Sequence, residues 1–287
     1  MNTGSKVDIS LQIPIFYATD NKAAFLALVS MISVVKNTKH SIRFIILESN
    51  LDKDSINMLN HIKKYKNCKI EFRKIDENIL NGFWNTKWVT IQAWFRLLIP
   101  WLYPDIKKAI YLDCDTMLVD DIIKFYNIDI ENYLLAATPE CVDEQHAKRL
   151  NLKNPHFFNS GVLLINCEKW KKDDLFTKVK KIVMENNPMD FGDEDVFNLV
   201  ADNAKKIVYD DMIYIEPWWF SSFKLKEGPH VIIHFTGNKP SYFKCKHSLR
   251  HIWREIAKET PYYLDYLEKY RLGWDEYIKN PSISKNF

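Results

Sequence analysis

Apolar segments of strand length alternate with segments of helical period through the first two-thirds of this 287-residue chain. Strands are expected over residues 13–18, 42–47, 69–72, 109–112, 134–137, 161–165 and 231–235. Helices are expected after residue 20 and over residues 52–65, 90–99, 174–185 and 194–200. The alternation is typical of stacked βαβ units, so it predicts an α/β fold with a mainly parallel central sheet flanked by helices.

Local changes in the sequence mark helix ends and a boundary between two parts of the chain. Asp20 stands where the N-cap of the first helix belongs, and Pro100 and Pro104 are expected to end the helix over residues 90–99. The composition shifts only after residue 240, where aromatic and basic residues interleave. We therefore expect a compact domain over residues 1–240 and a helical tail over residues 241–287.

Charge and cysteine content exclude several classes of protein. The net charge of +3 is too small to indicate a nucleic-acid partner, and the positive surplus lies in residues 239–287. The five cysteines contain no CxxC pair, which argues against a disulfide framework or a thiolate zinc site and favours the cytoplasm. Residues 1–12 do not resemble a secretory signal, and the longest apolar stretch, residues 23–35, is too short to span a bilayer.

A strand runs directly into Asp113-Cys114-Asp115 in the segment KAIYLDCDTMLVDD. Ligands bind at the carboxyl ends of strands in open α/β sheets. Residues i and i+2 of an extended segment point the same way, so both carboxylates can face one hard cation. Alone, the motif could equally be a pair of solvated aspartates in a turn.

A second candidate segment, IIHFTGNK, places His234 at a strand end and Gly237 and Lys239 shortly after it. An imidazole could complete a metal site with the two aspartates, and the lysine could bind a phosphate. A lone strand-end histidine is more often structural, and the pairing with the carboxylate segment favours the functional interpretation. The chain has only 7 glycines, which argues against a glycine-rich phosphate loop.

Two further segments can line a ligand site. FGDEDVFN places Asp193 and Glu194 at a helix start, where carboxylates either cap the helix or bind sugar hydroxyls near a reacting carbon. FFNSGVLLIN enters its strand through Asn159-Ser160-Gly161, whose small residues suit a crowded wall beside a ligand. Each segment by itself also fits a structural role.

In order and spacing these segments resemble glycosyltransferase family 8, the retaining group that includes bacterial lipopolysaccharide galactosyl- and glucosyltransferases. The resemblance covers residues 13–242, and the matching motifs are YATD, AWFRLLIP, YLDCDT, FNSGVLLIN, GDEDVFN and HFTGNKP. The resemblance implies a GT-A fold and transfer of a hexosyl group, glucose or galactose, from a UDP-sugar to a saccharide or lipid-linked glycan. It further implies Mn²⁺, or Mg²⁺ in its place, as the cofactor.

The resemblance also implies a role for each matching residue. Asp113, Asp115 and His234 would hold the metal on the diphosphate, within the nucleotide-binding Asp113-Cys114-Asp115 motif. Ala18 and Asp20 would contact uracil or ribose, while Lys239 and the backbone of Gly237 would hold the phosphates. The donor sugar would be bound by the remaining residues: Arg96, Asn159 and Asp193.

The sequence departs from the family pattern at three positions. Lys22-Ala23 stands where relatives often have Asn-Tyr, and the segment HFTGNK has one residue fewer before Lys239 than the commoner pattern. The usual DQD is Asp193-Glu194-Asp195 here, so a carboxylate replaces an amide beside the anomeric carbon. We hypothesise that Glu194 acts in catalysis with Asp193, at least by stabilising an oxocarbenium-like transition state.

Three rival functions were weighed against sugar transfer. A haloacid-dehalogenase-type phosphatase would use Asp113 as its nucleophile, but three strands are expected before Asp113, and His234 would have no role. A sugar nucleotidyltransferase needs a glycine-rich loop after the first strand, which YATDNKAA lacks. A non-catalytic sugar-nucleotide-binding protein would not need the complete acid and histidine set.

The tail over residues 241–287 has two open interpretations. In the first, it binds an anionic membrane peripherally, on the inner face where a lipid-linked acceptor lies. Alternatively it forms amphipathic helices that pack on the core with their aromatic residues inward. The sequence leaves the donor sugar, the acceptor and the oligomeric state open.

Overall fold

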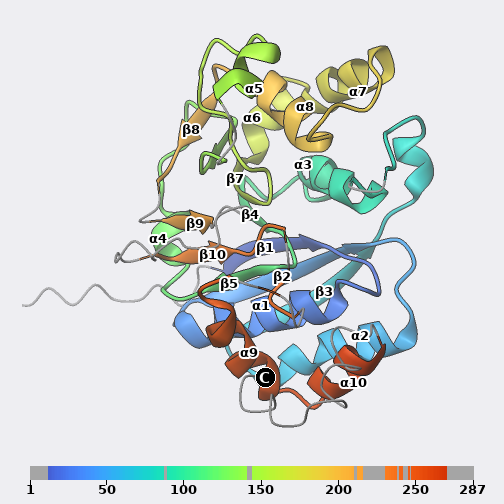
Figure 1. Ribbon diagram of the computed structural model, residues 1–287, viewed down its shortest axis with the longest axis vertical. Helices are drawn as coiled ribbons and strands as arrows, with labels where there is room; N and C mark the ends of the chain where they lie inside the picture. The colour runs from blue at the N-terminus through green and yellow to red at the C-terminus, as the bar shows by residue number, and fades with distance from the viewer. Residues whose placement is uncertain are drawn as a thin grey trace, which may run out of the picture.

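A seven-stranded sheet forms the centre of the computed structural model, which describes residues 12–86, 89–140, 144–209, 212–215, 230–237, 239–241, 245 and 247–269 (Figure 1). Its strand order is β3-β2-β1-β4-β7-β6-β8. The strands are β1 (Gln12–Ala18), β2 (Ser41–Glu48), β3 (Cys68–Lys74), β4 (Lys108–Leu112), β6 (Leu135–Ala137), β7 (Val162–Asn166) and β8 (Lys205–Ile207). The sequence predicted all of these strands except β8.

Most strand pairs of this sheet are parallel, as predicted. β1, β2, β3 and β4 all run in one direction, and β6 pairs parallel with β8. Only β7 runs antiparallel to its neighbours, β4 and β6. The central β1 is an apolar run buried on both faces, as expected for a strand covered by helices on each side.

The order of the strands reverses between β1 and β4. From β1 the chain moves outward through β2 to β3 and then crosses back to β4 on the other side of β1. In α/β folds, ligands bind outside the carboxyl ends of the strands at such a reversal. Ala18 ends β1 and Asp113 follows β4, so two of the predicted site residues lie at this point.

A second, three-stranded sheet brings a distant segment to the same place. β10 (Ile232–His234) pairs antiparallel with β5 (Thr116–Leu118) and parallel with β9 (Ile213–Ile215). The pairing sets His234 opposite Thr116, one residue after Asp115. The sheet thereby joins the predicted histidine to the two predicted carboxylates.

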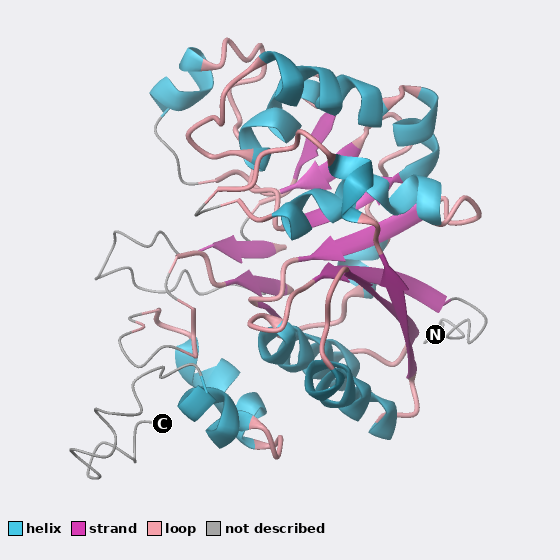
Figure 2. Cartoon of the chain, turned by 90° about the vertical axis from the view of Figure 1, so that its right-hand side faces the viewer, coloured by secondary structure: helices cyan, strands magenta, loops and turns pink. Residues whose placement is uncertain are grey.

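Helices cover the central sheet in two groups, each with its own apolar cluster (Figures 1 and 2). One group lies on one face: α1 (Ala24–Asn37), α2 (Lys53–Asn60), the 3₁₀ helix His61–Lys64, α9 (Arg250–Lys258) and α10 (Tyr263–Lys269). The other group lies on the opposite face: the 3₁₀ helix Ile91–Leu98, α3 (Ile99–Leu102), α6 (Cys167–Lys172), α7 (Leu175–Glu185) and α8 (Asp193–Val200). Shorter elements complete the chain: the 3₁₀ helix Glu77–Leu80, α4 (Ile123–Tyr126) and α5 (Glu144–Arg149).

Two predicted helix ends differ from the structure. Pro100 does not end a helix but lies in the first turn of α3, where its missing N–H costs no hydrogen bond. Asp20 caps the turn that precedes α1 and not the helix itself, since its Oδ1 accepts from the backbone N–H groups of Lys22 and Ala23. The helix begins at Ala24.

The described part of the tail packs on the core with its aromatic side chains inward. Trp253 of α9 and Tyr263 and Tyr266 of α10 surround Phe25 of α1, with ring centroids 4.5 to 6.1 Å from the Phe25 ring. All four side chains are buried. This arrangement favours the packing interpretation for residues 247–269, while the boundary after residue 240 stays a prediction. Among the described residues, no helix has the length and apolar character needed to cross a bilayer.

Candidate functional site

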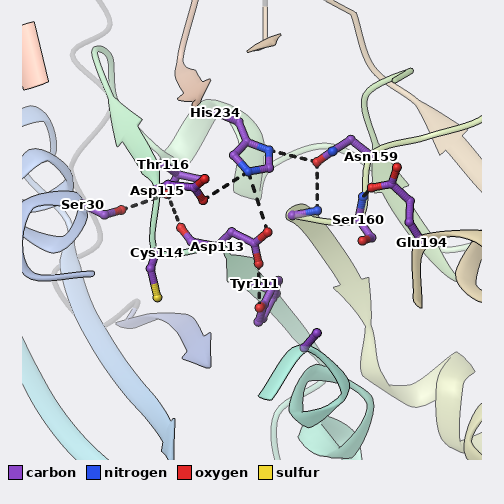
Figure 3. Close-up of polar contacts among 12 residues, drawn as sticks. Ser30, Tyr111, Asp113, Cys114, Asp115, Thr116, Asn159, Ser160, Glu194 and His234 are labelled. Atoms are coloured by element: carbon purple, nitrogen blue, oxygen red, sulfur yellow. Dashed lines mark hydrogen bonds and ion pairs between the residues drawn. The ribbon is translucent and has the colours of Figure 1, made fainter. Parts of the chain in front are cut away.

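Asp113, Asp115 and His234 form a cluster at the carboxyl end of β4 (Figure 3). One ligand atom from each lies within 4.8 Å of the others. His234 Nε2 is 3.3 Å from Asp115 Oδ1 and 3.7 Å from Asp113 Oδ2. The three residues that the sequence predicted as metal ligands are therefore brought together.

The amide of Asn159 orients the imidazole of His234. Its Oδ1 accepts from His234 Nδ1 and from the N–H of Gly161, each at 2.9 Å. Its Nδ2 donates to Glu140 Oε2 at 2.6 Å. Because a carboxylate can only accept, this contact identifies the amide nitrogen and hence the orientation of the Asn159 side chain. His234 therefore carries a proton on Nδ1, and its Nε2 is directed at the two carboxylates, as metal-binding histidines require.

This donor set suits Mn²⁺ or Mg²⁺, because hard cations prefer carboxylate oxygens and Mn²⁺ also accepts imidazole. The two carboxylates raise the pKa of His234 although burial acts to lower it. They are thus arranged to stabilise positive charge at Nε2. Gly161 leaves room for this contact, since a Cβ atom there would collide with the His234 ring and the Asp113 carboxylate.

Arg96 lies behind the cluster and links it to the start of α8. Its NH2 is 3.5 Å from Asp113 Oδ1 and 3.4 Å from Asp193 Oδ2, and its NH1 donates to the Ser160 carbonyl. The guanidinium also stacks 4.4 Å from the ring centroid of Tyr111. Burial acts to lower the pKa of Arg96, but its neighbours, including both aspartates, raise it overall. Arg96 is thus a buried cation that positions two carboxylates.

The predicted pair Asp193 and Glu194 begins α8 beside the Asn159-Ser160-Gly161 segment. Ser160 N–H donates to Glu194 Oε2 at 2.8 Å (Figure 3). Burial, and next the nearby Glu140 carboxylate, raise the pKa of Glu194 well above its usual value. Burial also raises the pKa of Asp193, although Arg96 opposes the shift. Both carboxyl groups therefore lie where an approaching cationic centre would be favoured.

The third acid of this segment, Asp195, has a structural role. It is fully buried, accepts from His146 Nε2 at 2.6 Å and accepts from the N–H of Phe191 at 2.9 Å. These bonds tie α5 to the start of α8. Asp195 thereby holds the backbone that carries Asp193 and Glu194.

Lys239 contacts the cluster of Asp113, Asp115 and His234 through Asp115. Its Nζ forms an ion pair with Asp115 Oδ2. Lys239 and His234 outweigh the effect of burial and lower the pKa of Asp115. Gly237 lies between His234 and Lys239 in the sequence, and its φ of 74° favours glycine. A lysine beside a hard-cation site is suited to an anionic phosphate ligand.

Of the residues predicted to contact the nucleotide, Ala18 and Cys114 lie next to each other. Cys114 Sγ donates to the Ala18 carbonyl at 3.3 Å, which joins the end of β1 to the aspartate motif. Burial raises the pKa of the Cys114 thiol, so it remains a neutral, packed side chain. Asp20 follows on the same loop and its Oδ1 holds the turn before α1. Their contacts with a nucleotide stay predictions.

Sequence reasoning missed several residues that shape the site. Tyr111 OH donates to Asp113 Oδ1 at 2.8 Å, and Glu140 fixes Asn159. The contact between Tyr111 and Asp113 could have been predicted, because residues i and i+2 of an extended segment lie on the same face. Glu140 follows β6, which ends at the same edge, but only the fold brings it to Asn159.

The scan against family models matches residues 14–240 to the model described as glycosyl transferase family 8. A Haemophilus influenzae protein assigned provisionally to the glycosyltransferases is 29% identical over 283 residues, which cover 94% of this chain and 84% of that protein. The lipopolysaccharide 1,2-glucosyltransferase of Escherichia coli is 23% identical, over 90% of this chain and 81% of its own.

Solved structures share the fold. The galactosyltransferase LgtC in complex with donor and acceptor sugar analogues superposes with a TM-score of 0.74 at 22% identity, over 88% of this chain and 96% of its own. An LgtC active-site mutant with a glutamine replaced by glutamate also superposes with a TM-score of 0.74, at 23% identity, over 87% and 96% of the two chains. The predicted GT-A fold is confirmed by these likenesses.

Proposed function

The chain belongs to glycosyltransferase family 8, and we propose that it is a retaining enzyme that moves glucose or galactose from a UDP-sugar to a hydroxyl group of a saccharide or glycoconjugate. The observation that carries this proposal is the convergence of Asp113, Asp115 and His234 beside Lys239. Family membership decides against the phosphatase alternative, in which Asp113 would be a nucleophile. It also decides against a non-catalytic binding protein.

The metal ligands would be Asp113, Asp115 and His234, and the ion would be Mn²⁺ or Mg²⁺. When bound, the ion neutralises charge on the diphosphate as UDP leaves. Lys239 would donate to the phosphate oxygens, and the side-chain-free Gly237 would let the backbone approach them. Together these residues stabilise the largest negative charge that develops during transfer.

Other residues would bind the rest of the donor. Ala18 and Asp20, at the end of β1, would contact uracil or ribose, and Cys114 would hold the loop between them and the aspartates. Asp193 would accept hydrogen bonds from hydroxyl groups of the sugar, and Asn159 would donate to them. Arg96 supports this pocket from behind, because its own donors are directed at Asp113, Asp193 and the Ser160 carbonyl.

Glu194 and Asp193 are our candidates for stabilising positive charge at the anomeric carbon. Retention requires attack from the side of the departing UDP or a double displacement, and both pass through an oxocarbenium-like centre. We predict that Glu194→Gln keeps the affinity for UDP-sugar and changes kcat. Single-turnover kinetics measures the step, and an unchanged rate would exclude a catalytic charge on Glu194.

The donor hexose is tested by a screen. The named relatives differ in the sugar for which they are named, one being a glucosyltransferase and another a galactosyltransferase. UDP-glucose and UDP-galactose should be hydrolysed slowly without acceptor when Mn²⁺ is present, and one should be preferred. Hydrolysis of neither sugar nucleotide, with UDP binding intact, would require another donor class.

The acceptor we propose is a saccharide, free or linked to a lipid. A lipid-linked acceptor would place the enzyme peripherally on the inner face of the cytoplasmic membrane. Since the aromatic residues of α9 and α10 are buried, such contact would depend on basic side chains and anionic lipid. Binding to anionic vesicles that weakens as salt increases would support this contact, and equal binding to neutral vesicles would contradict it.

A further inference from the structure

The loop over residues 234–240 carries His234, Gly237 and Lys239, and the C-terminal segment contacts it at both ends. This segment comprises residue 245 and residues 247–269, which include α9 and α10. In Figure 1 the two helices lie on the α1 side of the central sheet. The contacts come from two buried side chains, His247 and Arg254.

His247 supports the end of the loop next to His234. Its ring packs on the ring of Phe235 with centroids 4.5 Å apart, and it also meets Tyr214 of β9 edge-on at 6.3 Å. Phe235 N–H donates to the carbonyl of Asp115 at 3.0 Å. The ring of His247 therefore packs on the residue that joins His234 to the aspartate motif.

Arg254 supports the end of the loop next to Lys239. Its Nε donates to the carbonyl of Pro240 at 3.1 Å, and only 5% of Arg254 is exposed. Pro240 is itself buried and directly follows Lys239. A hydrogen bond from a buried charged donor is among the stronger kinds, so this contact fixes the backbone at which the lysine side chain begins.

The helix that bears Arg254 is firmly anchored. Its neighbour Trp253 is fully buried, with its ring meeting Phe25 of α1 at 6.0 Å and Tyr263 of α10 at 6.3 Å. At the end of α9, Glu259 pairs with Lys36 of α1. Because α1 also packs against the central sheet, these contacts hold α9 in place, and Arg254 of α9 in turn holds the end of the loop.

We propose that His247 and Arg254 are positioning residues of the donor site, His247 for the metal ligand His234 and Arg254 for the phosphate-binding Lys239. The proposal rests on the proposed function, because it assigns the two supported residues to metal and diphosphate. It makes the C-terminal segment a working part of the site and not a separable attachment.

The test measures metal and nucleotide binding separately. Arg254→Met should raise the Kd of UDP at saturating Mn²⁺ by about tenfold, the effect of losing one charge-assisted hydrogen bond, while binding Mn²⁺ alone no more weakly than the wild-type protein does. His247→Ala should raise the Kd of Mn²⁺ alone by about tenfold, as loss of support for a metal ligand does. Electron paramagnetic resonance of free Mn²⁺ and calorimetry with UDP give the two constants.

Three controls separate positioning from folding. His247→Phe keeps a ring against Phe235 and should restore Mn²⁺ affinity, while Lys258→Met removes a similar charge from the exposed side of α9 and should change neither constant. Thermal melting shows whether each variant is folded. The proposal would be overturned if both variants weakened Mn²⁺ binding and UDP binding equally. It would also be overturned if folded Arg254→Met and His247→Ala kept the wild-type Kd values for Mn²⁺ and UDP. Failure of the wild-type protein to bind UDP would instead refute the proposed function.

Discussion

Lys239 forms an ion pair with Asp115, one of the proposed metal ligands. A divalent cation held by Asp113, Asp115 and His234 would therefore be repelled by the Lys239 ammonium, and a bound diphosphate would reduce this repulsion by accepting from the lysine. We therefore expect Lys239→Gln to bind Mn²⁺ alone more tightly, by about tenfold, and UDP more weakly. Titration of Mn²⁺ with and without UDP measures both changes.

The charge-preserving variant Lys239→Arg serves as the control. It should keep the weaker Mn²⁺ affinity of the wild-type protein, because the repulsion remains. An unchanged Mn²⁺ affinity in Lys239→Gln would show that the ammonium does not oppose the metal.

Lys205 supplies a pH-dependent contribution to stability. Its Nζ is buried and has no hydrogen-bond partner among the residues that the structure describes, with Asp202 3.8 Å away. Burial lowers the pKa of Lys205 to about 8. Between this value and the unfolded pKa of 10.5, the unfolded chain binds more protons than the folded one, so the stability contributed by this group rises with pH over that interval and is constant below about pH 8.

Lys205→Met should therefore stabilise the protein at pH 7, by up to roughly 3 kcal/mol. Asp202 stays satisfied in the variant, because its carboxylate accepts from the N–H groups of Lys153 and Asn154. Urea unfolding at pH 7 and pH 10 measures the effect, and the advantage of the variant should shrink at pH 10. An advantage that does not change with pH would contradict a shifted lysine.

At the residue scale, the sequence predicted the acids and the histidine but not their supports. Asp113 and His234 could be found because each directly follows or ends an apolar strand, and Asp115 because it lies two residues after Asp113. Glu140 and Asn159 form a hydrogen bond although they lie 19 residues apart in the sequence. No rule of sequence spacing predicts such a contact. The prediction that Arg96 binds the donor sugar stays a prediction, and the structure adds that its nitrogen atoms also contact protein oxygens, including those of Asp113 and Asp193.

At the scale of elements, α1 supports the turn that carries Asp113 and Asp115 through a chain of hydroxyl groups. Tyr17 OH lies 2.9 Å from Ser30 Oγ, which lies 2.9 Å from Thr116 Oγ1, and Thr116 donates to the Asp113 carbonyl at 2.8 Å. Figure 3 shows the part from Ser30 onward. Each hydroxyl group can donate once, so the chain satisfies all three buried groups.

Ser30→Ala breaks this chain in its middle. It leaves the Tyr17 hydroxyl without its acceptor in a fully buried position, so we expect a loss of about 1–3 kcal/mol in unfolding free energy. Urea denaturation measures the loss, with Ser41→Ala at the half-buried start of β2 as the control. A loss no greater than that of the control would show that the chain does not stabilise the turn.

The sequence predicted the long strands and, among the three-residue strands, β6 and β10, whose apolar runs continue beyond the paired residues. It did not predict β5, β8 and β9. Strands such as β1 and β2 are continuous apolar runs bounded by polar residues, which the sequence displays directly. β5, β8 and β9 have three residues each, too few for a period to be recognised. Their pairing is decided by tertiary contacts, and for this reason the small sheet that positions His234 became visible only in the structure.

At the scale of the whole molecule, the C-terminal helices complete the apolar core around α1. Truncation after Tyr242 would expose Phe25 and the neighbouring buried face of α1, which the aromatic residues of α9 and α10 now cover. We expect the truncated chain to be insoluble or strongly destabilised. Expression followed by gel filtration provides the measurement, and a soluble truncated protein with full activity on a soluble acceptor would support the membrane interpretation instead.

The central claim is metal-dependent transfer from a UDP-hexose at Asp113, Asp115 and His234. The most direct measurement is UDP release from UDP-glucose and UDP-galactose after metal removal by chelation and again after Mn²⁺ is restored. The account predicts no release in chelator, recovery with Mn²⁺, and loss of that recovery by at least about a hundredfold in folded Asp115→Asn. Release that continues in chelator, or that Asp115→Asn leaves unchanged, would contradict it.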